Sequence, residues 1–288
     1  MTAVSYAHTW RVRVRGRRRV VGAGTLVASR TVLTCAHVAA RALDADMRGS
    51  APAGSATVDF PGSVDRSALD ASVDPSGWLP VDAPGGGDLA LLRLAADPPG
   101  DVHPASLREC GDPAGRQVQA FGHPAGLDAG AWARARLVGY GGPGPGWIQF
   151  DGVDTTGRAI AGGFSGAGVV EAGGHVIGMV VAEDPEPAAR VAWMIPVEVC
   201  VRRLPALAGL PALAGLADPV GLADPVGLAD PAGRESADPG MPRPRVSAAD
   251  LHRLADALSE VPAIRDADSR GQIIAELRPA IAGSVRHH

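Results

Sequence analysis

The chain has 288 residues, with 46% apolar and 20% charged residues, which are values typical of a globular protein. Its formal net charge is −4, which does not favour nucleic acid or a membrane surface as a partner. No run of about 18 apolar residues is present, so we expect no transmembrane helix. The first ten residues are polar and lack the apolar segment of a secretory signal peptide.

The chain has three cysteines, which lie far apart in the sequence: Cys35, Cys110 and Cys200. An odd number without metal-type spacing indicates free thiols rather than disulfides or a metal site. Free thiols are typical of a reducing compartment. The sequence therefore predicts a cytoplasmic protein that needs no metal and no cofactor.

Short strands dominate the first part of the chain. Residues 10–15 alternate between apolar and charged side chains, and Val20-Val21 begins a second apolar run after a turn, so we predict a hairpin. Six arginines lie between Arg11 and Arg19. They could form an anion-binding patch, but a charged strand face that keeps a sheet edge soluble is the interpretation we favour.

Two polar residues then stand next to apolar strands. Residues 22–38 predict a strand, a turn and a second strand that ends at His37. A lone histidine in such a place is more often structural than catalytic. Asp88 directly precedes the apolar run 89–94, and it is either a turn residue or an orienting acid. Asp82, the nearest other acid, lacks a following strand.

Ser165 lies within Ala161-Gly162-Gly163-Phe164-Ser165-Gly166-Ala167-Gly168, among four glycines. Glycines adopt backbone angles that other residues avoid, and they let a substrate carbonyl approach the main chain closely. Two N–H groups can then point at one spot beside the hydroxyl, as an oxyanion requires. A glycine-rich turn with a serine is common in loops, so this motif gains weight only together with a base and an acid.

Taken together, the motif Val-Leu-Thr-Cys-Ala-His-Val around His37, Asp-Leu-Ala-Leu-Leu-Arg-Leu at Asp88 and the glycine-rich turn at Ser165 resemble the three catalytic segments of trypsin-like (chymotrypsin-fold) serine peptidases. The resemblance covers about residues 8–203 and is strongest to bacterial members. It implies a mainly β fold of two Greek-key β-barrels with the active site in the cleft between them.

The resemblance also implies roles for individual residues. His37 would be the general base, Asp88 the orienting acid and Ser165 the nucleophile, with the N–H groups of Gly163 and Ser165 forming the oxyanion hole. The strand 176–183 would line the primary specificity pocket. Together with the residues that precede the serine, this strand would supply the pocket residues Ala159, Ile160, Val181, Ala182 and Glu183. The apolar Ala159 and Ile160 favour small or apolar substrate side chains, whereas the acids Glu183 and Asp184 favour basic ones. We expect small or apolar side chains on balance.

This chain departs from the animal members of that family at two places. Phe164 precedes the serine where those proteins have an acid that pairs with a new N-terminus on activation, and no cysteine follows His37. His123 stands where the family usually has tyrosine, and we expect it to be structural. The enzyme would therefore be either constitutively active or controlled by another part of its chain.

Beyond residue 203 the composition changes. Six-residue repeats rich in proline and glycine begin at Leu204, and we predict a linker over residues 204–246. Residues 247–288 show helical periodicity after a capping-box-like Ser247, and they resemble the beginning of an effector-associated domain, a helical adaptor of bacterial conflict systems. This module would bind a homotypic helical partner.

The sequence thus predicts a serine endopeptidase over residues 1–203, acting on protein or peptide substrates and recruited or regulated through its C-terminal module. Two alternatives remain open. A peptidase fold that no longer turns over would act as a binding or scaffold protein, and an esterase would use the same nucleophile on other substrates.

Overall fold

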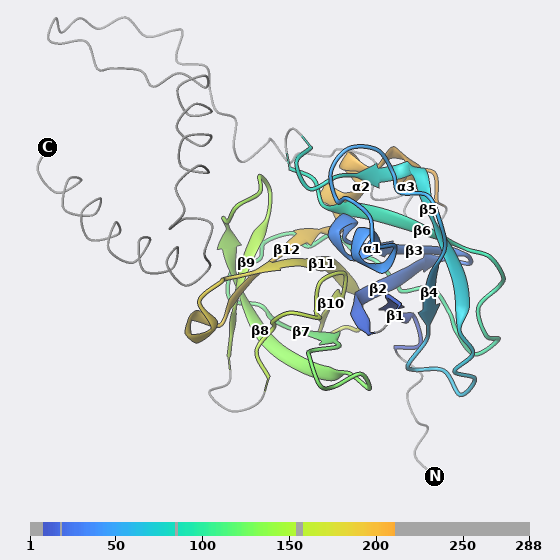
Figure 1. The fold of residues 1–288 in the computed structure, drawn as a ribbon. Coiled ribbons are helices and arrows are strands. Elements are labelled where there is room, and N and C mark those ends of the chain that lie inside the picture. Colours follow the sequence, from blue (N-terminus) through green and yellow to red (C-terminus); the bar gives the residue numbers. More distant parts are fainter. Residues whose placement is uncertain (1–7, 18, 84–85, 154–157, 211–288) are drawn as a thin grey trace, which may run out of the picture. The chain divides into compact units, whose positions relative to one another are not determined.

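The computed structural model describes residues 8–17, 19–83, 86–153 and 158–210. The repeats beyond residue 210 and the predicted helical module, 247–288, lie outside the described residues. The described residues belong to one compact unit. Within its described part, two closed six-stranded barrels follow one another along the chain (Figure 1).

The first barrel contains six antiparallel strands in the order β1-β2-β3-β6-β5-β4. Their bounds are β1 Arg11–Arg15, β2 Val20–Ala28, β3 Thr31–Thr34, β4 Ala56–Asp59, β5 Leu69–Leu79 and β6 Leu89–Leu94. The predicted hairpin is present, since β1 pairs with β2. Its arginines alternate with fully buried valines, and Arg13 and Arg15 both contact the buried Asp59 at 2.9 and 2.8 Å. Part of the arginine cluster is therefore paired within the barrel.

The second barrel repeats this arrangement in the order β10-β11-β12-β9-β8-β7. Its strands are β7 Gln117–Gly122, β8 Ala131–Tyr140, β9 Ile148–Gly152, β10 Gly168–Glu171, β11 Val176–Glu183 and β12 Val191–Pro196. Alternate residues of these strands point inward, as Val118 and Ala120 do on β7. The mainly β fold of two barrels is thus confirmed.

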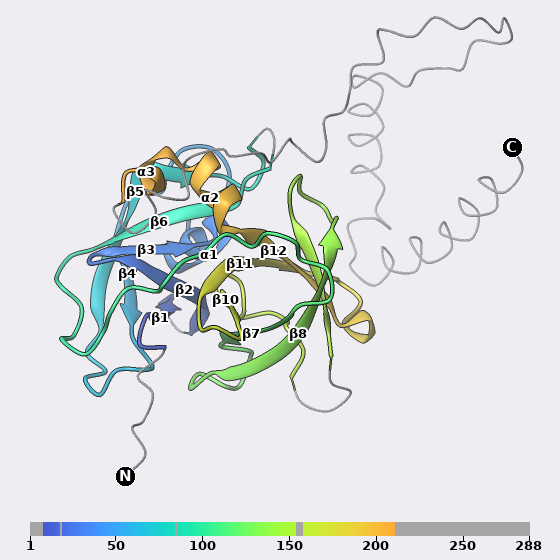
Figure 2. The same ribbon diagram turned by 180° about the vertical axis from the view of Figure 1, so that it is seen from behind.

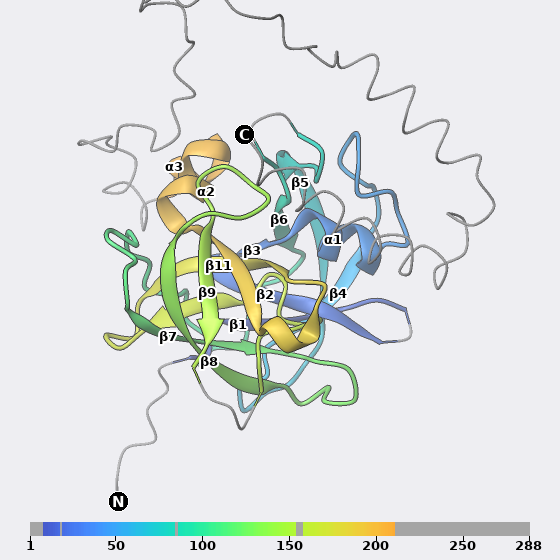
Figure 3. The same ribbon diagram turned by 90° about the vertical axis from the view of Figure 1, so that its left-hand side faces the viewer.

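Few helices accompany the barrels in the described part of the chain. Helix α1, Ala36–Ala42, follows β3, and the single turn η1, Pro187–Ala189, connects β11 to β12. Helices α2, Val197–Arg203, and α3, Pro205–Ala208, follow β12 and lie at the same end of this unit as β5 (Figures 2 and 3). None of the helices described here is long and apolar enough to span a membrane.

Two apolar clusters hold the barrels together. One surrounds Phe150, Phe164 and Leu137 inside the second barrel. The other fills the first barrel and extends to Met179 of β11 and to Val199 of α2, so it also joins the two barrels. Burying a side chain of this size contributes about 1.5–3 kcal/mol, so the contact between the barrels is a substantial part of the fold's stability.

Two sequence-based expectations need adjustment. His37 does not end a strand: β3 stops at Thr34, Cys35 precedes the helix, and His37 lies in the first turn of α1. Helix α3 lies within the range predicted as linker, and Leu204 and Leu207 are only 2% and 1% exposed. Both leucines belong to the apolar cluster that fills the first barrel, so the ordered chain continues beyond Arg203.

Candidate active site

His37 and Asp88 form a doubly hydrogen-bonded pair. The backbone N–H of His37 donates to Asp88 Oδ1 at 2.9 Å, and His37 Nδ1 lies 2.7 Å from Asp88 Oδ2. The topology explains this meeting, because β3 pairs with β6 and the end of one strand adjoins the start of the other. A proton on Nδ1 satisfies the carboxylate, which leaves Nε2 as the acceptor of the imidazole.

The backbone at Asp88 favours this arrangement. Asp88 has a φ of 73°, in the left-handed region that aspartate and asparagine enter more readily than most residues. Its N–H donates to the carbonyl of Leu79 at 3.0 Å, which fixes the peptide at the start of β6. The side chain is only 6% exposed, so its bonds to His37 form away from bulk water. Asp82, the alternative acid, is exposed.

The residues before Ser165 form a tight turn. The N–H of Phe164 donates to the carbonyl of Ala161 at 3.0 Å, and Gly163, the third residue of this turn, has a φ of 96°. A positive φ at that position is typical of a type II turn and favours glycine. A Cβ on Gly163 would lie 2.2 Å from the carbonyl oxygen of His123, so a side chain does not fit there.

Phe164 anchors the turn to the second barrel. Its ring is fully buried, and a Cβ on Gly122 would lie 2.4 Å from it. The phenylalanine therefore holds the serine turn by apolar packing at the position where animal family members use an acid. His123 lies beside this turn, and burial lowers the pKa of its imidazole to about 4. It is neutral at neutral pH and packs against Phe121, in keeping with the structural role we expected.

Main-chain contacts tie the serine turn to the first barrel. The N–H of Ala23 donates to the carbonyl of Ser165 at 2.9 Å. A Cβ on Gly22 would lie 2.7 Å from Val38 and 3.0 Å from the carbonyl oxygen of Ser165, so the serine backbone and α1 flank the same glycine. Ser165 is thereby held beside the helix that carries His37, although no hydrogen bond joins Ser165 Oγ to the imidazole in the described structure. In enzymes without substrate such bonds are often long.

The N–H groups of Gly163 and Ser165 have no hydrogen-bond acceptor among the described residues. The amides of three neighbouring residues are occupied: Phe164 donates to Ala161, Gly166 to Val180 and Ala167 to Phe164. The two free donors at residues 163 and 165 therefore flank an amide that is bound within the turn. They could both bind one oxygen atom with a developing negative charge.

Cys35 lies beneath the pair. Donor atoms of Cys35, His37 and Asp88 lie within 4.8 Å of one another, which is a spacing that a metal ion could use. However, both Asp88 oxygens accept hydrogen bonds from His37, and the Cys35 thiol donates to the carbonyl of Val180 at 3.3 Å. Burial also raises the pKa of this thiol well above its usual value. The donor set therefore favours a hydrogen-bonded acid–imidazole pair over a metal centre.

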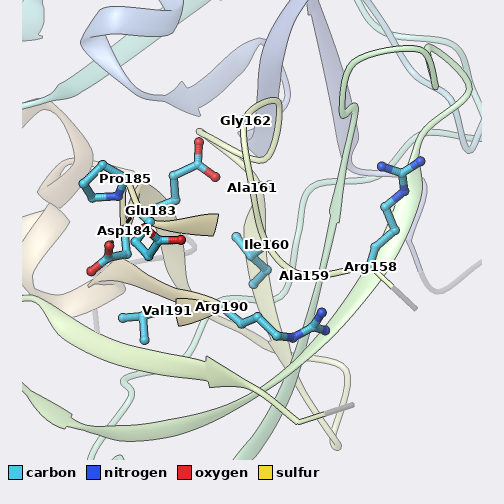
Figure 4. Close-up of a pocket in the computed structure, with 11 residues that line it drawn as sticks. Arg158, Ala159, Ile160, Ala161, Gly162, Glu183, Asp184, Pro185, Arg190 and Val191 are labelled. Carbon is cyan, nitrogen blue, oxygen red and sulfur yellow. Dashed lines mark hydrogen bonds between the residues drawn. The ribbon is translucent and has the colours of Figure 1, made fainter. Parts of the chain in front are cut away.

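A cavity of about 680 Å³ adjoins the serine turn (Figure 4). Residues 158–162 line one side, and residues 183–186 with 190–191 line the other. Of the residues expected in the specificity pocket, Ala159, Ile160 and Glu183 line this cavity, whereas Val181 and Ala182 do not, and Val181 is buried in the core. Burial raises the pKa of Glu183, and the nearby backbone N–H of Gly162 partly offsets this rise.

Arg158 and Arg190 also line this cavity, and neither was predicted from the sequence. Arg190 follows the η1 turn directly and begins the segment that leads into β12, and no motif marks it. A signal was present in the chain, because a charged residue immediately before a strand that borders the predicted pocket is a candidate for its wall. The sequence alone gave no position for the loop between β11 and β12.

Comparisons with known proteins agree with this architecture. A profile described as a trypsin-like peptidase domain matches residues 22–179. No curated protein matches the chain. A crystal structure of the Rv3671c protease of M. tuberculosis in an inactive form superposes with a TM-score of 0.50 at 21% identity, covering 72% of this chain and 92% of that one. The serine endoprotease of Yersinia pestis superposes with a TM-score of 0.52 at 18% identity, covering 72% and 67%.

These two structures share the fold with the present chain, at identities too low to carry details of the site. The matched segment, 22–179, contains the serine turn, the paired His37 and Asp88, and most of both barrels. It spans more than half of the chain, and the chain belongs to the family of trypsin-like peptidase domains.

Proposed function

We propose that the chain is a serine endopeptidase in which Ser165 is the nucleophile, His37 the general base and Asp88 the orienting acid. The observation that carries the proposal is the pair of hydrogen bonds from His37 to Asp88. His37 lies on α1, and Gly22 lies between this helix and the backbone of Ser165. A fixed acid–imidazole pair beside a serine on a tight turn is the arrangement that nucleophilic acyl transfer requires.

The reaction would proceed in two halves. Ser165 Oγ attacks the carbonyl carbon of the scissile peptide bond while His37 Nε2 takes the hydroxyl proton. The imidazolium then donates this proton to the leaving amine, and the acyl group stays on Ser165. Water, deprotonated by the same imidazole, hydrolyses the ester and releases the serine. Asp88 holds the proton on Nδ1 throughout and stabilises the transient positive charge.

The free N–H groups of Gly163 and Ser165 would bind the oxyanion formed in both halves. Each such donor contributes about 3 kcal/mol to stabilisation of the transition state. The type II turn supports this assignment, because it leaves the Gly163 amide outside the hydrogen bond that closes the turn. The hydrogen bond between Asp88 and His37 is already present without substrate, so little reorganisation would be needed before reaction.

The proposal is tested by peptide hydrolysis with the full chain. Wild type should cleave internal peptide bonds of an unstructured protein, and Ser165→Ala and His37→Ala should each reduce the rate by about 10⁴-fold or more. Cleavage of simple esters but not of peptides would favour the esterase alternative. Binding of peptides without cleavage would favour a peptidase-fold scaffold protein. A rate of peptide hydrolysis that is the same in Ser165→Ala as in wild type would exclude this serine as the nucleophile.

We further propose that residues 247–288 recruit or regulate the peptidase through a helical partner, with residues 211–246 as a linker. The support is the helical periodicity of the segment and the repeats before it. A shortened chain should end after Leu210, because Leu204 and Leu207 are buried against the first barrel. Equal peptidase rates and equal partner binding by the full and shortened chains would refute this role.

The cytoplasmic location also stays a proposal. It is supported by Cys35, Cys110 and Cys200, which are all buried and unpaired. Fractionation of cells that produce the protein, with a cytoplasmic and a secreted marker as controls, tests it. Recovery with the secreted marker would refute it.

A further inference from the structure

Arg190 gives the cavity beside the serine turn a positive charge that the described residues do not neutralise. Its guanidinium lies against the backbone of Gly152, since a Cβ on that glycine would be 3.2 Å from Arg190 Nε and 3.4 Å from Nη2. Nε is buried and has no hydrogen-bond partner. No carboxylate of the described residues forms an ion pair with Arg190. Arg190 is half-buried, and a half-buried cation without an ionic partner can form a charge-assisted hydrogen bond with an anionic ligand.

The carboxylates of the same cavity are engaged elsewhere. Asp184 accepts the N–H of Glu186 at 2.8 Å, and Glu186 accepts the N–H of Ala188 at 3.3 Å as the cap of η1. The Glu183 carboxylate lies near the backbone of Gly162. Asp184 and Glu186 therefore stabilise the loop between β11 and β12, and none of the three acids forms an ion pair with Arg190.

The shape of the cavity separates the two signs of charge. In Figure 4 the Glu183 carboxylate and the Arg190 guanidinium lie on opposite sides of Ile160. Ile160, Ala159 and Val191 supply apolar surface in between. A side chain with an aliphatic stem and a terminal carboxylate would place its stem along this apolar surface and its charge at Arg190.

We propose that Arg190 is the specificity determinant of this cavity and selects substrates with an acidic residue, Glu or Asp, on the amino side of the scissile bond (P1). The proposal rests on the proposed function, because the cavity receives that residue only if the bond is cut at Ser165. It replaces the expectation of small or apolar side chains, which considered Ala159 and Ile160 without Arg190. A charge-assisted hydrogen bond from the accessible part of the guanidinium would provide the selection.

The experiment compares peptides that differ only at P1, with Glu, Gln, Leu or Arg, using the full chain. We expect kcat/KM for Glu to exceed that for its isostere Gln by roughly 10- to 100-fold, the value of one hydrogen bond to a charged group. In Arg190→Gln this ratio should fall to about 1, while kcat/KM for the Leu peptide changes by less than about threefold. Arg158→Gln is the matched control, since Arg158 is an exposed arginine of the same cavity, and it should keep the ratio.

A second arm needs no turnover. Calorimetric titration of the full-length Ser165→Ala protein with the same Glu and Gln peptides should give tighter binding of Glu by a similar factor. A ratio of 1 or below in both arms, or a ratio that persists in Arg190→Gln, would overturn the proposal. Failure of the proposed function looks different: Ser165→Ala would then cleave as fast as wild type, or neither would cleave, while the binding arm still decides the role of Arg190.

Discussion

Replacement of Gly163 by alanine tests the assignment of the oxyanion hole. The added Cβ would lie 2.2 Å from the carbonyl oxygen of His123 and 2.6 Å from its carbon, both atoms of the main chain. Nonbonded carbon and oxygen atoms do not approach so closely, and no flexible side chain can move aside. The Gly163 peptide itself must therefore shift or rotate, and its N–H leaves the place where it would meet the substrate oxygen.

The size of the effect follows from two separate costs. The φ of 96° at Gly163 is unfavourable for alanine by about 1–2 kcal/mol, and this cost reduces the free energy of unfolding. Loss of one oxyanion donor costs about 3–4 kcal/mol of transition-state stabilisation, which lowers kcat by about 10²- to 10³-fold. Since this donor acts on the transition state, we expect KM to change far less than kcat.

Gly174→Ala is the matched control for this prediction. Gly174 has a φ of 80° in the turn between β10 and β11, and a Cβ there would meet nothing within 4 Å. It bears the same backbone cost without disturbing the serine turn. Urea unfolding and peptide hydrolysis of both variants separate the two costs. If kcat for Gly163→Ala stays within about threefold of that for Gly174→Ala, the Gly163 amide does not stabilise the oxyanion.

Three further predictions concern charged groups. Asparagine in Asp88→Asn tolerates the φ of 73° but cannot hold the proton on His37 Nδ1. In steady-state assays kcat should therefore fall by about 10⁴-fold, and a loss below tenfold would contradict the role of Asp88. Burial lowers the pKa of His123 from 6.5 to about 4, so as pH falls the unfolded chain protonates this histidine before the folded chain does. The free energy of unfolding should therefore fall between pH 6.5 and 4, by up to about 3 kcal/mol. In urea titrations at pH 7.5 and 5, His123→Gln should lose this pH dependence, and an equal pH dependence in the variant would count against the reasoning. Asp59→Asn leaves Arg13 without its buried partner and should lower the free energy of unfolding by about 3 kcal/mol in the same titration, whereas a loss below about 0.5 kcal/mol would mean that water compensates.

Several strands were accessible from the sequence. Alternating burial on β1 and the long apolar run of β11 follow directly from the pattern of side chains. Strand β5 was not predicted, because it carries polar and glycine residues in the middle of a long strand.

The candidate site was accessible where chemistry and local pattern coincide. Three polar residues adjoin apolar strands in a family-like order, and the structure brings His37 and Asp88 within 2.7 Å of each other. The placement of His37 on a helix was not predicted, because a seven-residue helix after a strand leaves almost no periodicity to read. Arg190 was missed for a related reason: its role depends on the shape of the loop between β11 and β12 and on contact with the distant Gly152. The charge before β12 is visible in the sequence, but contacts between such remote segments are not.

Covalent labelling of Ser165 tests the central claim most directly. A fluorophosphonate reacts with a serine only when a base and an oxyanion site activate it, so the full-length protein should take up one label per chain, on the peptide that contains Ser165. His37→Ala should abolish the labelling, and Gly174→Ala should not. Labelling that is absent in wild type, located on another residue or unchanged in His37→Ala would contradict the account.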